Sequence, residues 1–222
     1  MIYDILKTGS SGNCTIINKE IAIDIGVPMN MIMGSGYINT LKLVLLTHLH
    51  SDHFKKSTAN RLHKIRPGLR FVCCSWMVQP LQDAGVGKNV IDVCALGLCF
   101  LYRNFIKIKP ERIPHNVDNC CWHIWYGNDS LFYATDCSSL SMIKAENYRT
   151  YMIEANHSRA EIEARIAAKH AAGEFAYEEA AMRNHLSEEQ ALEWLAENMG
   201  PESRYAFLHQ HVDEKKKREA TA

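Results

Sequence analysis

Four residues that can bind a metal ion lie within one run of six positions: His48, His50, Asp52 and His53. Residues two positions apart on an extended segment point the same way, so two imidazoles here can chelate one metal. Asp52 and His53 lie where the chain is expected to turn into a helix, and they would project toward a second metal. A helix start with scattered surface histidines explains such a dense group less well. The spacing therefore predicts a site for two metals.

This cluster cannot complete two coordination spheres, because a catalytic zinc-type site uses about three protein ligands and a water molecule. Other parts of the chain must contribute. The candidates, each next to an expected strand or helix, are His115, Asp136, His185, His209 and His211.

Short apolar or alternating segments separated by turn residues predict a β-rich first part of the chain. The run 43–46 ends directly before the histidine cluster, as expected of a buried strand whose carboxyl end opens onto a site. Expected strands are 15–17, 21–26, 41–46, 70–72, 90–93, 105–108, 121–126, 130–134 and 205–208, with a hairpin turn at 127–129. Expected helices are 51–65, 159–169 and one starting at the capping box of Ser187. Two sheets flanked by helices is the simplest architecture for these elements.

The chain has 222 residues, of which 47% are hydrophobic and 23% charged, as in a globular protein. We expect a single domain over 1–222, with 213–222 as a solvated tail. Without a long apolar window or a visible export signal, the expectation is a cytoplasmic protein that does not enter a membrane. The eight cysteines include two adjacent pairs and no CxxC pair, which predicts buried, reduced thiols.

Net charge gives no global argument for nucleic-acid binding, because 25 basic residues balance 25 acidic ones. Local basic patches remain available at 55–56, 61–70 and 215–218, the last of which is expected to be solvated.

The order HxHxDH, lone His, lone Asp and late His resembles the metallo-β-lactamase superfamily, from Lys7 to about Val212. The resemblance implies an αββα sandwich of two mixed β-sheets flanked by helices. It also implies two divalent metal ions, with Asp136 bridging them. One metal would be held by His48, His50 and His115, and the other by Asp52, His53 and a late histidine.

Further motifs resemble the YycJ/WalJ-type branch, whose members are considered bacterial or phage exonucleases that act on DNA. They are the segments 9–14, 24–26, 114–116, 133–136, 154–157 and 184–187. The chain departs from that branch at Asn184, where Gly is usual, and at Gln210-His211, where Leu-Ser is usual. The late ligand is therefore open between His209 and His211. His209 is favoured because it directly follows the strand 205–208, whereas His211 lies beside charged residues.

Two neighbouring metals can activate water and stabilise the negative charge on phosphoryl oxygens, which suits phosphodiester hydrolysis. Zinc, manganese and iron all suit a set of histidines and carboxylates. Asp52 and His185 are the expected catalytic residues. The resemblance places His185 near the substrate phosphate rather than on a metal, although it could be an exposed loop histidine. Asp24 is expected to contact the second ring nitrogen of a ligand histidine, and His157 is expected to support the edge of the site.

A DNA exonuclease or nuclease is the leading hypothesis. The zero net charge and the lack of an added nucleic-acid domain favour a small-molecule, cyclic phosphodiesterase as the alternative. A noncatalytic metal-binding protein is a third hypothesis, and the complete ligand set argues against it.

Overall fold

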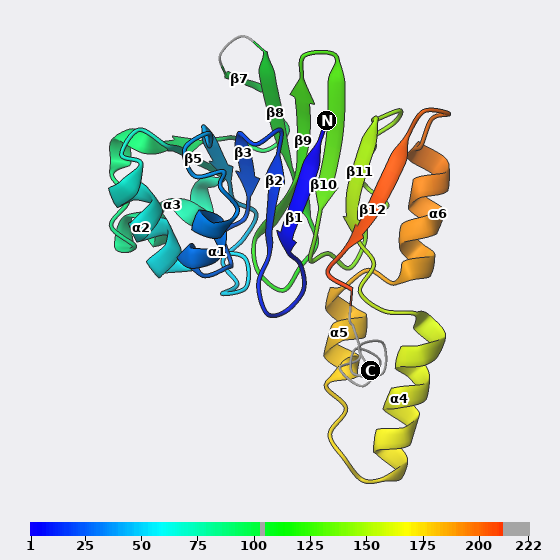
Figure 1. Cartoon of the computed structure of the whole chain (residues 1–222). Helices are drawn as coiled ribbons and strands as arrows, with labels where there is room; N and C mark the ends of the chain where they lie inside the picture. Colours follow the sequence, from blue (N-terminus) through cyan, green and yellow to red (C-terminus); the bar gives the residue numbers. More distant parts are fainter. Residues whose placement is uncertain (103–104, 211–222) are drawn as a thin grey trace.

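In a computed structural model of the chain, which describes residues 1–102 and 105–210, two six-stranded sheets face each other (Figure 1). The first sheet has the order β1-β2-β3-β4-β5-β6 and the second the order β12-β11-β10-β9-β8-β7. Both sheets are mixed, because antiparallel pairs at one side give way to the parallel pairs β3-β4-β5-β6 and β10-β11-β12. The two-sheet architecture expected from the sequence is confirmed.

The strands and helices of the first half run in chain order as follows: β1 Tyr3–Lys7, β2 Cys14–Ile17, β3 Ile21–Ile23, α1 Met29–Gly34, β4 Leu43–Leu45, α2 Lys56–Ile65, β5 Arg70–Cys73, α3 Val78–Asp83 and β6 Ile91–Val93. Short 3-10 turns cover Ser75–Met77 and Lys88–Val90. The second half continues with β7 Phe100–Tyr102, β8 Ile106–Ile113, β9 Asn119–Tyr126, β10 Asp129–Ala134, β11 Thr150–Glu154, α4 Arg159–Ala171, α5 Glu178–Asn184, α6 Glu188–Asn198 and β12 Arg204–Leu208.

Alternation along the strands decides which side chains fill which layer of the core. In β4, Leu43 and Leu45 pack between the sheets, whereas Val44 packs under α1, α2 and α3. Trp122 of β9 is fully buried and contributes to the layer between the sheets. Trp194 of α6 closes a third cluster on the outer side of the second sheet. Burial of these apolar surfaces is the main driving force for this layered arrangement.

Several expected elements needed correction. The helix expected from residue 51 begins at Lys56, because the single turn over 50–54 is followed by a β-bridge between Phe54 and Ile25 rather than by further helical hydrogen bonds. The backbone N–H of Asn13 donates to Asp52 O at 2.6 Å, and that of Ile25 donates to His53 O at 2.9 Å. The strand expected at 105–108 continues to Ile113. The expected turn at 127–129 is shorter, because Asp129 already pairs with Tyr126 in the hairpin of β9 and β10.

Strands β1, β7 and β11 and helices α1, α3 and α5 were not expected from the sequence, although the Ser187 capping box of α6 is present. Seven of the eight cysteines are buried free thiols, as expected, whereas Cys99 is exposed. Among residues 1–102 and 105–210, no helix is both long and apolar enough to cross a lipid bilayer. The expected tail at 213–222 lies outside the described residues.

Candidate metal centre

Loops at the ends of strands bring all seven expected ligands together at one edge of the sandwich. The first group consists of His48, His50, His115 and Asp136, whose potential ligand atoms lie within 4.8 Å of one another. The second consists of Asp52, His53, Asp136 and His209. Asp136 belongs to both groups, as the sequence resemblance implies for a bridging carboxylate, and also to a third group with Glu154, His185 and His209. Their role as metal ligands remains a prediction, but their convergence is a feature of the fold.

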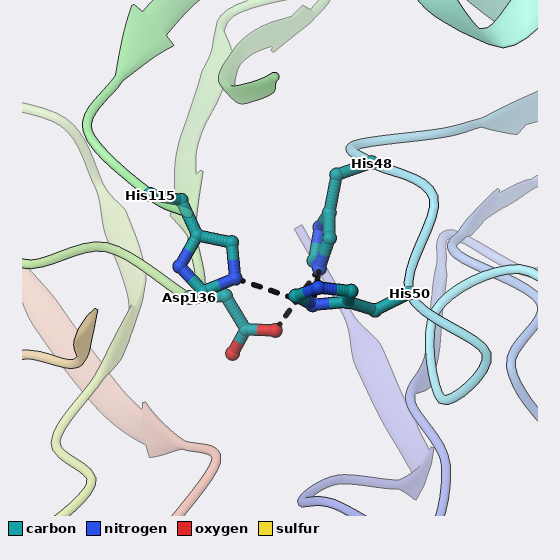
Figure 2. A group of neighbouring side chains, drawn as sticks. All are labelled: His48, His50, His115 and Asp136. Carbon is teal, nitrogen blue, oxygen red and sulfur yellow. Dashed lines mark hydrogen bonds and ion pairs between the residues drawn. The ribbon is translucent and has the colours of Figure 1, made fainter. Parts of the chain in front are cut away.

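The first group joins the loop after β4 to the ends of β8 and β10 (Figure 2). His50 Nδ1 lies 3.2 Å from His48 Nε2 and 3.2 Å from His115 Nε2. Asp136 Oδ2 lies 3.2 Å from His48 Nε2. Three imidazole nitrogens and one carboxylate oxygen therefore point into one small space.

The second group adjoins the first through Asp136. Asp136 Oδ2 lies 2.8 Å from His53 Nε2, and Asp52 Oδ2 lies 3.6 Å from the same nitrogen. His209 Nε2 lies 3.5 Å from Asp52 Oδ2 and is a buried ring nitrogen without a hydrogen-bond partner among the described residues. Asn13, in the loop between β1 and β2, also borders this group, because its Nδ2 atom lies 2.8 Å from His53 Nε2.

These separations fit divalent metal ions. A tetrahedral ion with bonds of about 2.0–2.2 Å to nitrogen and oxygen holds its ligand atoms about 3.4 Å apart. Most of the nitrogen and oxygen atoms in both groups lie 3.2–3.6 Å from their neighbours. The buried Nε2 atom of His209, which makes no hydrogen bond among the described residues, would gain a partner from a metal ion. Both groups therefore suit a metal ion in donor type and in spacing.

Asp24 contacts a histidine of one group directly, as expected, and a histidine of the other group through Thr47. Its Oδ2 atom lies 2.7 Å from His53 Nδ1, which fixes the Nε2 atom of that ring toward Asp136. It also accepts a hydrogen bond from the Thr47 hydroxyl, which lies 2.9 Å from His48 Nδ1. Asp24 and Thr47 are fully buried. One carboxylate thus orients one histidine of each group.

Left-handed backbone conformations direct three of these side chains. Asp24, Asp136 and His209 have φ values of 58°, 53° and 51°, and they follow strands β3, β10 and β12 closely. This conformation is unfavourable for residues other than glycine and clusters at functional sites. It turns the chain sharply at the strand end, so that the side chain leaves the pleat and enters the site.

Electrostatic interactions within the centre are strong because its groups are buried. Although burial alone lowers it, the pKa of His53 is raised well above its ordinary value by the charges of Asp136 and Asp24. In the same way, Asp52 and Glu154 outweigh burial and raise the pKa of His209 to about 10. Burial lowers the pKa of His115 to about 4. Metal binding at the second group would release protons from histidines.

Glu154 is a member of the site that the sequence analysis quoted in a motif without assigning it a role. Its Oε1 atom lies 2.6 Å from His185 Nδ1 and 3.2 Å from His209 Nδ1. Its Oε2 atom accepts hydrogen bonds from the backbone N–H groups of Cys137 and Leu186. The side chain is fully buried at the end of β11, a strand that the sequence analysis missed. The only sequence signal for Glu154 was its place in the motif at 154–157.

The remaining expected residues lie as follows. His185 Nδ1 is 3.6 Å from Asp136 Oδ1, and its ring stacks on His209 with centroids 5.1 Å apart, so it is not an isolated loop histidine. His157 contacts Asn156 at 3.4 Å, and Asn156 in turn contacts the His209 ring, which agrees with a supporting position at the site edge. His211 lies outside the described residues.

Comparisons with known proteins agree on the fold and leave the family open. No protein-family model matches the chain, and no curated protein matches it in sequence. The metallo-β-lactamase fold protein YhfI from Bacillus subtilis superimposes with a TM-score of 0.71 at 13% identity, covering 98% of this chain and 90% of that one. Human tRNase Z, short form, superimposes with a TM-score of 0.70 at 13% identity, covering 95% of this chain and 93% of that one.

A diphosphatase from the PhnP family superimposes with a TM-score of 0.64, again at 13% identity, covering 97% of this chain and 89% of that one. At such low identity, these similarities establish architecture alone. Nearly the whole described chain takes part in each superposition, and the two mixed sheets with their flanking helices match. The protein has the metallo-β-lactamase fold.

Proposed function

We propose that this protein is a metal-dependent hydrolase of phosphodiester bonds with DNA as its substrate, a nuclease of the YycJ/WalJ type. The observation that carries the proposal is the position of Asp136, which belongs to both metal-binding groups and lies 3.6 Å from His185. Two metal sites side by side, with a proton donor at their edge, are the arrangement that phosphoryl transfer to water requires.

The residues divide into two ligand sets. His48, His50 and His115 would hold one zinc, manganese or iron ion, and Asp52, His53 and His209 the other, with Asp136 shared. When bound, two such ions activate water at neutral pH and neutralise the charge that develops on the phosphoryl oxygens. The histidine and carboxylate donors exclude none of these three metals.

His185 supplies the proton. Hydrolysis adds water oxygen to phosphorus and breaks the bond to the leaving oxygen, which needs a proton as it departs. The Nδ1 atom of His185 is held by Glu154, so Nε2 is the nitrogen left to donate that proton. Glu154 fixes the orientation of the His185 ring, and the two backbone N–H groups at its Oε2 atom keep the carboxylate in place. Asp24 keeps His53 in the tautomer whose Nε2 faces the second group.

The choice of DNA rests on the sequence resemblance, with support from the nucleic-acid enzyme tRNase Z among the similar structures. A small-molecule phosphodiesterase is the second candidate. The formal net charge of zero and the similar diphosphatase structure favour it. The two candidates differ in salt dependence, because binding of DNA through several cationic contacts weakens steeply with salt.

A direct assay tests the proposal. The protein reconstituted with manganese or with zinc is incubated with end-labelled duplex DNA, single-stranded DNA and a simple phosphodiester. Metal-dependent release of labelled nucleotides that declines with salt is the expected result. Hydrolysis of the simple ester alone, without salt sensitivity, would favour the small-molecule candidate. If no substrate is hydrolysed with either metal, the proposal that the protein is a phosphodiesterase is wrong.

The variant His185→Ala separates binding from chemistry. We expect it to retain both metals and to lose turnover by roughly 10²–10⁴-fold, the usual contribution of a general acid. His170→Ala is the matched control, since His170 lies far along the chain on exposed α4. Loss of a metal in His185→Ala would show that His185 is a ligand instead.

A further inference from the structure

A cavity of about 150 Å³ lies where the hairpin of α4 and α5 (residues 159–184) joins the rest of the protein. The hairpin projects from the end of the sandwich at which β12 ends (Figure 1). Ile162, Tyr177 and Ala181 line the cavity from the hairpin, and Asn156 and His157 line it from the loop after β11. None of the expected metal ligands lines this space, so it is distinct from the metal centre.

Two residues of the cavity wall touch the metal centre directly. Asn156 Nδ2 lies 3.1 Å from His209 Nδ1 and donates a hydrogen bond to His209 O at 2.9 Å. The carbonyl oxygen of Ala181 accepts a hydrogen bond from the backbone N–H of His185 at 3.0 Å. A group in the cavity would therefore lie beside His209 and His185, separated from each by a single residue.

The lining favours a neutral planar group over an anion. Three carboxylates border the cavity, Glu161, Glu178 and Glu188, against the single guanidinium of Arg165. A phosphate would meet repulsion there. The aromatic ring of Tyr177 and the aliphatic side chains of Ile162 and Ala181 provide apolar surface. The volume is below the roughly 300–1,000 Å³ of pockets for drug-sized ligands, so one ring system fits better than a whole nucleotide.

We propose that this cavity binds a nucleobase of the substrate while the adjoining phosphodiester lies at the metal centre; this rests on the proposed function. Lys169 Nζ covers one face of the Tyr177 ring, 3.7 Å from its centroid, so the other face is the one left to stack on a base, a contact that needs no sequence readout. The carboxamides of Asn156 and Gln210 offer both donors and acceptors to a base edge. The base would thus position the scissile bond relative to His185.

Binding of adenosine, a nucleoside without phosphate, tests the cavity apart from catalysis. Ala181→Phe fills the cavity, and Ala167→Phe is the matched control because Ala167 is exposed on α4 and does not line it. Equilibrium dialysis with the metal-loaded full chain should show saturable binding to the wild type and to the control. Ala181→Phe should bind roughly 5- to 150-fold more weakly, the range for losing one stacked base.

Equal affinity in Ala181→Phe, or no saturable binding to the wild type, would overturn the proposal. Thermal unfolding of each variant establishes that it is folded. If Ala181→Phe does not fold, Tyr177→Leu takes its place, because it removes the stacking ring and keeps an apolar side chain.

A kinetic comparison tests the cavity proposal independently of the proposed function. Methyl p-nitrophenyl phosphate and adenosine 5′-(p-nitrophenyl phosphate) share a leaving group and differ in the nucleoside. We expect Ala181→Phe to lower kcat/KM for the nucleoside ester by a larger factor than kcat/KM for the methyl ester. An equal fall for both esters would contradict the cavity proposal. If neither ester is hydrolysed, the proposed function fails, and adenosine binding still decides whether the cavity holds a base.

Discussion

The loop 47–53 and the set of Glu154, His185 and His209 form opposite sides of one site and are built in different ways. The loop is a single segment whose backbone is fixed by the neighbouring turns at Asn13 and Ile25. The other set is gathered from the end of β11, the end of α5 and the end of β12, across 55 sequence positions. Local spacing reveals the first arrangement, whereas the second depends on parallel pairing of strands. Proximity along the chain therefore reveals the loop 47–53 better than the side that is assembled from distant strands and helices.

The largest effect is expected for Asp136→Ala, since Asp136 contacts histidines of both sides. Removing its carboxylate takes a ligand from both metal groups, so both metals should be lost together and turnover with them. Elemental analysis after reconstitution and dialysis measures the equivalents bound per chain. Retention of one metal at wild-type affinity would contradict the bridging role.

A substitution that changes none of the expected ligand residues should still disturb the loop 47–53. A Cβ atom on Gly26 would lie 1.7 Å from Asp52 O, so Gly26→Ala must displace the backbone of Asp52 and His53. We expect loss of the second metal and a free energy of unfolding lowered by about 1–3 kcal/mol, as for other overpacked sites. Gly34→Ala is the control, because its Cβ atom would meet nothing within 4 Å. Metal content and urea unfolding of the two variants should differ clearly.

Glu154→Gln tests the other side and should have a smaller effect. Glutamine keeps the shape and can still accept hydrogen bonds, but it replaces one carboxylate oxygen by an amide group and so weakens the contact that orients the His185 ring. We expect both metals to remain and turnover to fall by roughly tenfold, at the lower limit of the 10–100-fold range for a residue that orients a ligand. The ratio of kcat to bound metal separates this result from a structural loss. Unchanged kcat would exclude Glu154 from a role in proton transfer.

The strands and the cluster at 48–53 could be predicted from the sequence because both are local patterns. The run 43–46 followed by His48 predicts a buried strand and its site, and the structure confirms the strand. The helix start at residue 51 was wrong because contacts of the loop with Asn13 and Ile25 override its helical pattern. The role of Glu154 could not be derived, since it depends on the register of β11 between β10 and β12. The left-handed φ of Asp24 leaves no sequence signal either.

The last prediction concerns stability rather than turnover and involves His123, a histidine outside both sides of the site. It belongs to none of the sequence motifs, and it is 1% exposed within β9, 2.7 Å from the Tyr148 hydroxyl. Burial, assisted by the charge of Lys109 and opposed by Glu111, lowers the pKa of His123 to about 4. The unfolded chain, with an ordinary histidine pKa of about 6.5, takes up a proton that the folded protein excludes. Stability should therefore fall as the pH falls from about 6.5 toward 4, by up to roughly 1.4 kcal/mol per pH unit from this residue.

The variant His123→Gln removes this titration and keeps a polar side chain that can bond to Tyr148. Urea unfolding at pH 6.5, 5.5 and 4.5 should show a shallower decline in the free energy of unfolding for His123→Gln than for the wild type. Because both proteins share the metal centre, the difference between their slopes isolates His123. Parallel curves for His123→Gln and the wild type would show that the folded protein does not keep His123 neutral. The pH response would then belong to the metal centre rather than to the core.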